Sequence, residues 1–552
     1  MKARRTMLTV LCFQRWLVCS HVQALRAAAF SRSVRVSPTT TVYQRQHHHL
    51  ASKANGVVLR STATSTDANI VSSPINSISQ LSLQDPLLIH WKGETNEGYS
   101  IQFRHDEFQG ALEAVVQQKY HLPSAPSVSL RFDNALHYTG TPQLDNMPEH
   151  KLLRYEEAMQ YLHITEEQSS SSSSMPSITQ QDVIQAAERC SLIHAIYQVV
   201  AESDSYEGLA EKALEKQSLQ DLQKGYENEH ATWCVRVRQY GDGTKQHKLK
   251  RHGEKSTRSV SAEKVALKAL TPLLLTLGGA VRLKDTDVKL YVMEGIIPPT
   301  LLSSTSTTFD DDADNNENAS TMILSRRIAR GPKASTIAPV TRICVTNTPL
   351  CPTAAYLMCN LGRLSAGATI LDPYGGSCAI LLAAGMMEPT VRSVAIEIAH
   401  NGLVNRTNIL RDFETRQIPP PVGLLQGDCT DAKIRADARA LVNDSDDDGF
   451  SLIITDPPYG IRESKNYNAQ TPIQELLSAI IYDRDVVQRR MLKVGGKLVV
   501  FLPCSHEEES FEDDVLPTKD ELERAGLELR YTKEQPLNDL LSRWLVVFDC
   551  VG

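Results

Sequence analysis

The 552-residue chain has no uncharged apolar run of the roughly 18 to 20 residues that cross a bilayer. The best candidate, residues 8–18, is too short and contains Arg15. The eleven cysteines include no Cys-x-x-Cys pair, and no histidine pair stands at zinc-ligand spacing. We therefore expect reduced core thiols, no metal site and no membrane association.

Acidic residues are absent from positions 1–66, which contain ten Lys or Arg, although the whole chain carries a net charge of −7. A leader that lacks acids and is rich in Arg and Ser is typical of organelle transit peptides. We therefore exclude residues 1–66 from the fold and expect import into a mitochondrion or plastid. A disordered basic tail is the alternative.

Two mixed α and β units are expected before the middle of the chain. Residues 83–165 predict a small α+β segment that begins with the strand-like sequence Leu-Leu-Ile-His-Trp. The serine tract at 169–174 predicts a loop. Residues 178–300 alternate between helical and strand patterns and predict a second α+β domain. The Asp-rich stretch that follows predicts a solvated linker over 301–334.

Residues 335–552 show short apolar strands that alternate with helices. The expected strands are 368–371, 393–396, 423–426, 451–454 and 497–502, and the expected helices are 352–361, 377–385, 400–414, 473–491 and 519–526. Alternating β and α elements favour an open, largely parallel, doubly wound sheet that binds ligands at the carboxyl ends of its strands.

A glycine-rich turn follows the first of these strands. Asp372 ends the strand, and Gly375 and Gly376 precede a helix. Glycines let backbone amides approach a ligand closely, and the carboxylate of Asp372 would reach the crevice. The turn lacks the Gly-x-Gly-x-x-Gly pattern, so an ordinary strand-turn-helix junction explains it equally well.

Two further acids end the next strands. Glu397 stands 25 residues after Asp372, a spacing that suits hydrogen bonds from ribose hydroxyls. Asp428 ends the third strand and could accept a bond from an adenine amino group. Each acid alone is more often solvated or a helix cap. Three in register predict a pocket for an adenosine-bearing ligand.

The most specific motif is Asp456-Pro457-Pro458-Tyr459, at the end of the fourth strand. An exocyclic base amine is a poor nucleophile because its lone pair is delocalised into the ring. The Asp456 carboxylate and the Pro457 carbonyl could accept its two N–H bonds, the prolines would stiffen both acceptors, and Tyr459 could stack on the base. The motif therefore predicts amine methylation. A rigid turn with a packed tyrosine is the alternative.

Asp-Pro-Pro-Tyr resembles the signature of S-adenosylmethionine-dependent amino-methyltransferases, and the longer string over 455–463 is similar to the tRNA guanosine-10 N2-methyltransferases. Asn347-Thr348 resembles the entry to that family's cofactor loop. Other matching stretches are 372–380, 427–428 and 542–545 in the last hairpin, and 187–193 and 278–283 resemble its RNA-binding THUMP region, preceded by a ferredoxin-like segment. The resemblance implies a C-terminal Rossmann-like methyltransferase domain behind these two α+β parts.

The resemblance also implies roles and partners. S-adenosylmethionine would be bound by Asp372, Glu397 and Asp428, and the amine of a guanine extruded from tRNA would be held by Asp456 and Tyr459. A small zinc-binding activator subunit would cover an apolar edge of the catalytic domain. The resemblance also implies a location in the cytoplasm.

One residue departs from the family pattern. Cys378 stands where the pattern has a glycine, and its side chain could crowd the methionine part of the donor. A catalytically weak RNA-binding paralogue is therefore one alternative. An N6-adenine or other amino-methyltransferase on RNA or DNA is another, because the four-residue signature does not distinguish bases.

RNA binding needs a local basic patch, because the chain is acidic overall. Six cations within fourteen residues form the candidate: Lys245, Lys248, Lys250, Arg251, Lys255 and Arg258. Such a cluster could hold tRNA phosphates. An ordinary solvated loop is the alternative.

Overall fold

A computed structural model describes residues 85–92, 101–122, 128–136, 159–166, 177–215, 232–240, 260–277, 280–282, 286–300, 322–346, 348–397, 404–442, 449–459, 490–505, 510–537 and 541–552. All of these residues belong to one compact unit, Val71–Gly552. Three predicted features, the leader at 1–66, the serine tract at 169–174 and the basic patch at 245–258, lie outside the described residues. Among the described helices, none is long and apolar enough to span a membrane.

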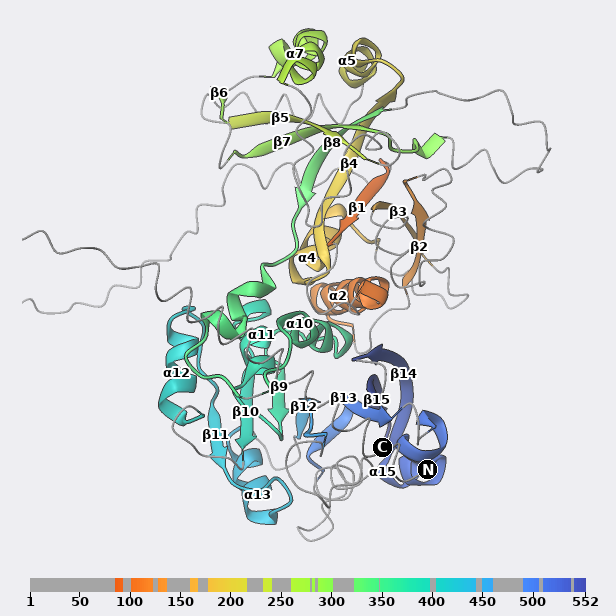
Figure 1. Cartoon of the computed structure of the whole chain (residues 1–552). Helices are drawn as coiled ribbons and strands as arrows, with labels where there is room; N and C mark the ends of the chain where they lie inside the picture. Colours follow the sequence, from red (N-terminus) through yellow and green to blue (C-terminus); the bar gives the residue numbers. More distant parts are fainter. Residues whose placement is uncertain are drawn as a thin grey trace, which may run out of the picture. The chain divides into compact units, whose positions relative to one another are not determined.

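The N-terminal half is built on an eight-stranded sheet with the order β2-β3-β1-β4-β8-β7-β5-β6 (Figure 1). Its strands are β1 (Leu87–Trp91), β2 (Val128–Asn134), β3 (Met159–Glu166), β4 (Ile193–Ser203), β5 (Thr232–Gln239), β6 (Ala280–Val281), β7 (Val288–Glu294) and β8 (Met322–Ala329). The helical elements are η2 (Ile101–Phe103), α2 (Arg104–Lys119), α4 (Gln180–Arg189), α5 (Tyr206–Glu215), α7 (Val260–Ala269) and α8 (Thr271–Thr276).

Strand β4 joins the two expected α+β units into this one sheet. It pairs antiparallel with β1 on one side and with β8 on the other. Alternate side chains of β4 enter different cores, since Ile196 packs with α2 and α4 whereas Tyr197 packs on the opposite face. Residues of α5, α7 and α8 pack with those of β4, β5, β7 and β8.

The expected linker at 301–334 needs correction. Residues 322–329 form β8, a central strand of the sheet, and 334–337 begin the helical turns of the next domain. The acidic run masked this strand in the sequence, because Met322-Ile323-Leu324 is too short an apolar stretch to stand out behind it.

The C-terminal half is a doubly wound α/β domain, as predicted. Its seven-stranded sheet has the order β11-β10-β9-β12-β13-β15-β14. The strands are β9 (Thr369–Asp372), β10 (Arg392–Glu397), β11 (Gly423–Gln426), β12 (Phe450–Thr455), β13 (Leu492–Ser505), β14 (Leu527–Pro536) and β15 (Leu541–Cys550). Strands β9 to β13 are parallel, and β15 is antiparallel to both β13 and β14.

Helices cover both faces of this sheet. The helical elements are η5 (Ala334–Ile337), η6 (Pro339–Thr341), α10 (Pro352–Leu361), α11 (Ala379–Met387), α12 (Arg406–Glu414), α13 (Ala432–Ala440), η8 (Phe511–Val515) and α15 (Lys519–Ala525). Residues of α10, α11 and α12 share one core with Ile370, and residues of α13 and α15 share the other with Leu371. Successive residues of β9 thus point to opposite cores, as in a strand buried on both faces.

Two helices of this domain differ from the prediction, and a third prediction is untested. The helix expected at 400–414 begins only at Arg406, because the side chain of Asn405 caps it by accepting a bond from the Asn408 amide. Helix α13 was not expected, since it carries few large apolar residues. Most of the helix expected at 473–491 lies outside the described residues.

A buried glutamate connects α2 to α10. Glu107 is fully buried, and its Oε1 accepts hydrogen bonds from the Ser191 amide at 2.7 Å and from Asn360 Nδ2 at 3.2 Å. Its Oε2 accepts one from the Leu192 amide at 2.9 Å. A Cβ atom on Gly110, one turn along α2, would lie 2.5 Å from the Asn360 carbonyl oxygen, so glycine is needed for this close approach.

We predict that Glu107→Ala lowers the free energy of unfolding by about 3 kcal/mol, because it leaves several buried donors without an acceptor. Urea denaturation followed by circular dichroism measures the loss. The control is Glu211→Ala on the exposed side of α5, which should change stability by less than about 0.5 kcal/mol. Equal stability of the two variants would contradict the prediction.

Candidate active site

The carboxyl ends of three parallel strands bring acidic residues of the predicted motifs to one edge of the sheet. Asp372 and Glu397 end β9 and β10, and Asp456 directly follows β12. Strand β9 lies between β10 and β12. Parallel strands deliver their last side chains to the same edge, so the three carboxylates are neighbours.

A hydrogen bond links β9 to β12 within this edge. The Thr455 hydroxyl donates to Asp372 Oδ1 at 2.8 Å, and both residues are buried. The Tyr374 amide donates to the same oxygen at 3.3 Å. Asp456 therefore directly follows a residue that is hydrogen-bonded to the Asp372 carboxylate.

Burial raises the pKa of Asp372 to about 7. The two hydrogen bonds oppose this shift, whereas the nearby negative charges of Glu397 and Asp456 add to it. A cationic ligand would reduce the electrostatic repulsion between these carboxylates. The crevice is thus suited to a ligand that carries positive charge.

The glycine-rich turn wraps against the end of β10. The Gly375 amide donates to the Ile396 carbonyl at 2.8 Å, and the Gly376 amide donates to Glu397 Oε2 at 2.6 Å. A Cβ atom on Gly375 would lie 2.7 Å from the Ala395 Cβ, so only glycine fits without a shift of the strand. These contacts fix the turn beside a partly exposed carboxylate.

Cys378 does not project into the crevice. Its side chain is 1% exposed and belongs to the hydrophobic core beneath α10 and α11. The residue adopts a left-handed conformation with φ of 60° at the start of α11, which costs a non-glycine residue about 1 kcal/mol. The thiol packs inward, and crowding of the donor by this side chain stays a prediction.

The remaining cofactor-site candidates lie around this edge. Asp428 follows β11 and is exposed, and its Oδ1 accepts bonds from the Thr430 amide at 2.8 Å and from the Thr430 hydroxyl at 2.7 Å. Thr348 is exposed, and Asn347 lies outside the described residues. A Cβ atom on Gly376 would lie 3.5 Å from Thr346 Cγ2. The chain just before Asn347 is therefore next to the glycine-rich turn.

An arginine from another strand contacts both ends of the Asp456 motif, and the sequence did not assign it a role. The Tyr459 hydroxyl donates to Asp456 Oδ1. Arg543 Nη1, from β15, lies 3.1 Å from the Tyr459 hydroxyl oxygen and 3.5 Å from Asp456 Oδ2. Arg543 is itself held by Gln535 Oε1 at 2.7 Å and by the ring of Phe501, 3.9 Å below the guanidinium carbon.

Arg543 and burial act in opposite directions on the Asp456 carboxyl group. Burial raises the pKa of Asp456, whereas the charge of Arg543 and the bond from Tyr459 lower it. The nearby anion and phenol in turn raise the pKa of Arg543, although its burial opposes that shift. A buried arginine in the apolar strand Leu541–Cys550 needs an acid partner, and this was the signal in the sequence that could have identified it.

The predicted stacking of Tyr459 on a base stays a prediction, because the structure places its hydroxyl on Asp456. Pro457 is buried, and Pro458 and Tyr459 are half-buried. Among the described residues, no group of three or more His, Cys, Asp or Glu side chains could hold a metal ion.

Comparison with known proteins gives one family match. Residues 339–420, which run from η6 through the glycine-rich turn and α12 to the loop before β11, match the family described as "RMKL-like, methyltransferase domain". No curated protein sequence matches the chain significantly.

Solved structures with a related arrangement include TrmN from Thermus thermophilus, with 13% identity, a TM-score of 0.35 and coverage of 84% of this chain and 99% of TrmN. The precorrin-6y C5,15-methyltransferase from Geobacter metallireducens has 15% identity and a TM-score of 0.25, and covers 39% of this chain and 96% of its own. TM-scores this low carry no argument about function.

The C-terminal domain is therefore a methyltransferase domain, and S-adenosylmethionine is its methyl donor. The residues at the strand ends fit a cationic donor, since buried Asp372 lies near the negative charges of Glu397 and Asp456.

We predict that S-adenosylmethionine binds about tenfold more weakly at pH 6 than at pH 8, because Asp372 with a pKa of about 7 loses its negative charge as the pH falls. Calorimetric titration across this range measures the affinity.

The Asp372→Asn variant should bind S-adenosylmethionine weakly, and its affinity should not depend on pH in this range. The control is Glu414→Gln on the exposed side of α12, which should keep the wild-type profile. A flat profile for the wild-type protein would show that Asp372 does not contact the donor.

Proposed function

We propose that the protein transfers a methyl group from S-adenosylmethionine to the exocyclic N2 of a guanosine in tRNA, of the position-10 type. The observation that carries this proposal is the place of Asp456-Pro457-Pro458-Tyr459, directly after β12, with Thr455 bonded to Asp372. The amine-methylation motif thereby adjoins the carboxylate proposed for the donor.

The backbone of the motif supports two fixed acceptors. Proline locks φ near −65° and has no N–H group, so Pro457 and Pro458 hold the chain stiff without competing for the Asp456 carboxylate. The side chain of Asp456 is 20% exposed, which leaves it reachable from the crevice. When bound, S-adenosylmethionine supplies an electrophilic methyl carbon, and the two acceptors orient the amine toward it.

Asp456 can also accept the proton that the methylated amine releases. The amine nitrogen becomes cationic when it takes the methyl group, and it must then lose one hydrogen. A carboxylate whose pKa is raised by burial is a suitable acceptor at Oδ1. The positive charge of Arg543 favours the ionised carboxylate and so opposes the effect of burial on the pKa of Asp456.

Binding of the base changes the partner of Asp456 Oδ1. The Tyr459 hydroxyl takes this atom in the absence of substrate, so an incoming amine replaces it. Displacement frees the Tyr459 ring to move over the base. This sequence of contacts supports stacking on a nucleotide extruded from its helix.

Cations on the N-terminal sheet support RNA as the substrate class. Arg327 faces Tyr197 across β8 and β4, and Arg238 faces Met293 across β5 and β7. Tyr197 and Met293 share a core on the face opposite the described helices, and both arginines are close enough to Tyr197 to act on its pKa. Arginine side chains can hold phosphates without reading the base sequence.

The choice of N2 of guanine over N6 of adenine rests on the resemblance of residues 455–463. Nucleoside mass spectrometry of tRNA after reaction separates N2-methylguanosine from N6-methyladenosine, and fragment mapping gives the position. Methyladenosine would replace this proposal with the alternative. The inward packing of Cys378 weakens the case for a protein that only binds RNA.

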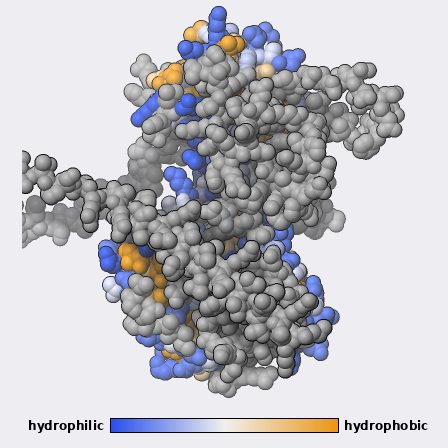
Figure 2. Space-filling model, in the orientation of Figure 1, coloured by the Kyte–Doolittle hydropathy of each residue, from blue (hydrophilic) through white to orange (hydrophobic). Residues whose placement is uncertain are grey.

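An activator subunit and an organelle destination remain predictions. Exposed apolar residues of the catalytic domain include Val340 in η6 and Val422 just before the edge strand β11. Figure 2 shows hydrophobic surface among hydrophilic surface in the lower half of the view, where Figure 1 has α12. Assay of residues 67–552 with and without a small zinc-binding subunit tests the proposed partner.

We predict that Asp456→Asn lowers methyl transfer to tRNA by about 100- to 1000-fold, because the amide offers one acceptor atom and no negative charge. S-adenosylmethionine affinity, measured by calorimetry, should stay within about twofold of wild type (a shift of roughly 0.4 kcal/mol). The control is the exposed Asp437→Asn on α13. Full activity of Asp456→Asn would overturn the role given to the carboxylate.

We predict that Arg238→Ala combined with Arg327→Ala raises the KM for tRNA about tenfold and lowers the slope of log affinity against log salt by about two. Donor affinity should not change. Lys433→Ala, which removes an exposed cation of α13, is the matched control. An unchanged salt slope would place the RNA on another surface.

A further inference from the structure

We infer that Asp412 is a positioning residue for the methyl-donor site, and that it acts through Arg342 on the carbonyl of Ser377 in the glycine-rich turn. Asp412 lies on α12 and belongs neither to the glycine-rich turn nor to the Asp-Pro-Pro-Tyr motif. The inference rests on the donor site alone and does not depend on which base accepts the methyl group.

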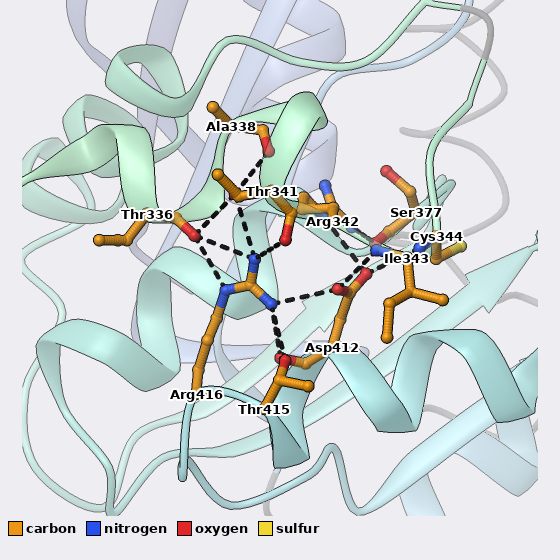
Figure 3. Close-up of polar contacts among 10 residues, drawn as sticks. All are labelled: Thr336, Ala338, Thr341, Arg342, Ile343, Cys344, Ser377, Asp412, Thr415 and Arg416. Carbon is orange, nitrogen blue, oxygen red and sulfur yellow. Dashed lines mark hydrogen bonds and ion pairs between the residues drawn. The ribbon is translucent and has the colours of Figure 1, made fainter. Parts of the chain in front are cut away.

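Both oxygens of Asp412 are used by the segment that leads to the donor site (Figure 3). Asp412 is fully buried. Its Oδ1 accepts a hydrogen bond from the Ile343 amide at 2.8 Å, and its Oδ2 accepts one from the Cys344 amide at 2.9 Å. Two successive backbone amides are thus fixed by one carboxylate, which sets the direction of the chain toward Thr346.

Arg342 carries the effect of Asp412 to the glycine-rich turn. Its Nε lies 3.6 Å from Asp412 Oδ2, and its side chain is 1% exposed. Its Nη2 donates a hydrogen bond to the Ser377 carbonyl. Burial lowers the pKa of Arg342, and the charge of Asp412 opposes that shift, so loss of the carboxylate leaves a buried cation unpaired.

The Ser377 carbonyl is a point at which the turn needs support. It belongs to the peptide that leads into Cys378, whose left-handed φ of 60° is unfavourable for a side chain with a Cβ. The Cys378 amide also closes a tight turn onto the Gly375 carbonyl at 2.6 Å. A strained conformation persists only where its surroundings hold it, and Arg342 is the side chain that holds this carbonyl.

Arg416 attaches the outer part of the same segment to α12. It donates to the Thr336 carbonyl at 2.9 Å from Nη2, to the Thr341 carbonyl at 3.0 Å, and to Asp412 Oδ1 at 3.1 Å. Figure 3 shows its guanidinium between the helix and the two threonines. Arg416 therefore anchors the chain before Arg342, whereas Asp412 and Arg342 orient the part that meets the donor loop.

The test compares two variants of the same helix in the full-length protein. Asp412→Asn keeps the shape of the side chain but replaces one acceptor by an NH2 group and removes the charge. Ile409→Ala removes a buried side chain that faces the core, so it costs stability without touching the network. Urea denaturation shows how much stability each variant loses, and calorimetry gives its affinity for S-adenosylmethionine.

We expect Asp412→Asn to raise the Kd for S-adenosylmethionine at least tenfold, and Ile409→Ala to leave it within twofold. Under turnover, the KM for the donor should rise in Asp412→Asn while the KM for the acceptor stays constant. Donor affinity in Asp412→Asn equal to that in wild type, or a loss equal to that in Ile409→Ala, would overturn the inference.

A second variant covers the case in which Asp412→Asn does not fold. Arg342→Lys keeps a positive charge beside Asp412, but a single ammonium group cannot reproduce the fork that contacts both Asp412 and Ser377. It should also weaken donor binding tenfold, and unchanged binding would overturn the inference. Calorimetry needs no RNA, so failure of the tRNA proposal would appear as absent methylation with these affinity changes intact.

Discussion

The hydrogen bond from Thr455 to Asp372 joins the two halves of the candidate site. It connects the end of β12, where the acceptor amine is proposed to bind, with the end of β9, where the donor pocket begins. Transfer between two bound molecules requires the reacting atoms to approach to about 3 to 3.5 Å in a fixed orientation. Two adjacent strands of a parallel sheet, buried on both faces, provide that rigidity better than loops would.

A concentration of negative charge at the strand ends is the electrostatic consequence of this arrangement. Burial raises the pKa of Asp372, and the negative charges of Glu397 and Asp456 act in the same direction. A sulfonium donor relieves the repulsion, and Arg543 relieves it on the acceptor side. The crevice therefore favours a cationic donor before any specific contact is made, and it is less suited to the neutral product that remains after transfer.

The sequence predicted what depends on local pattern. Strands β9 to β13 and helix α10 were found where alternating apolar runs placed them, and the motif acids lie at strand ends as their spacing required. It did not predict what depends on contacts between distant segments. β8 pairs with β4, which lies far before it in the chain, and no local signal pairs Arg543 with Asp456, 87 residues away. The Asp428 carboxylate was predicted by position, but its use of Thr430 in a turn was not.

Two buried arginines complete the site from outside its motifs, and each is paired with an aspartate. Arg543 comes from an antiparallel strand and holds Asp456 and Tyr459, whereas Arg342 comes from the segment before α10 and holds the Ser377 carbonyl. Each arginine is buried, so each would be costly without its acid. The residues proposed to bind the acceptor and the donor thus lie in the Asp-Pro-Pro-Tyr motif and the glycine-rich turn, and arginine–aspartate pairs formed across the fold support both segments. A chain with both motifs and without these arginines would retain the residues of the chemistry and lose the alignment that the reaction requires.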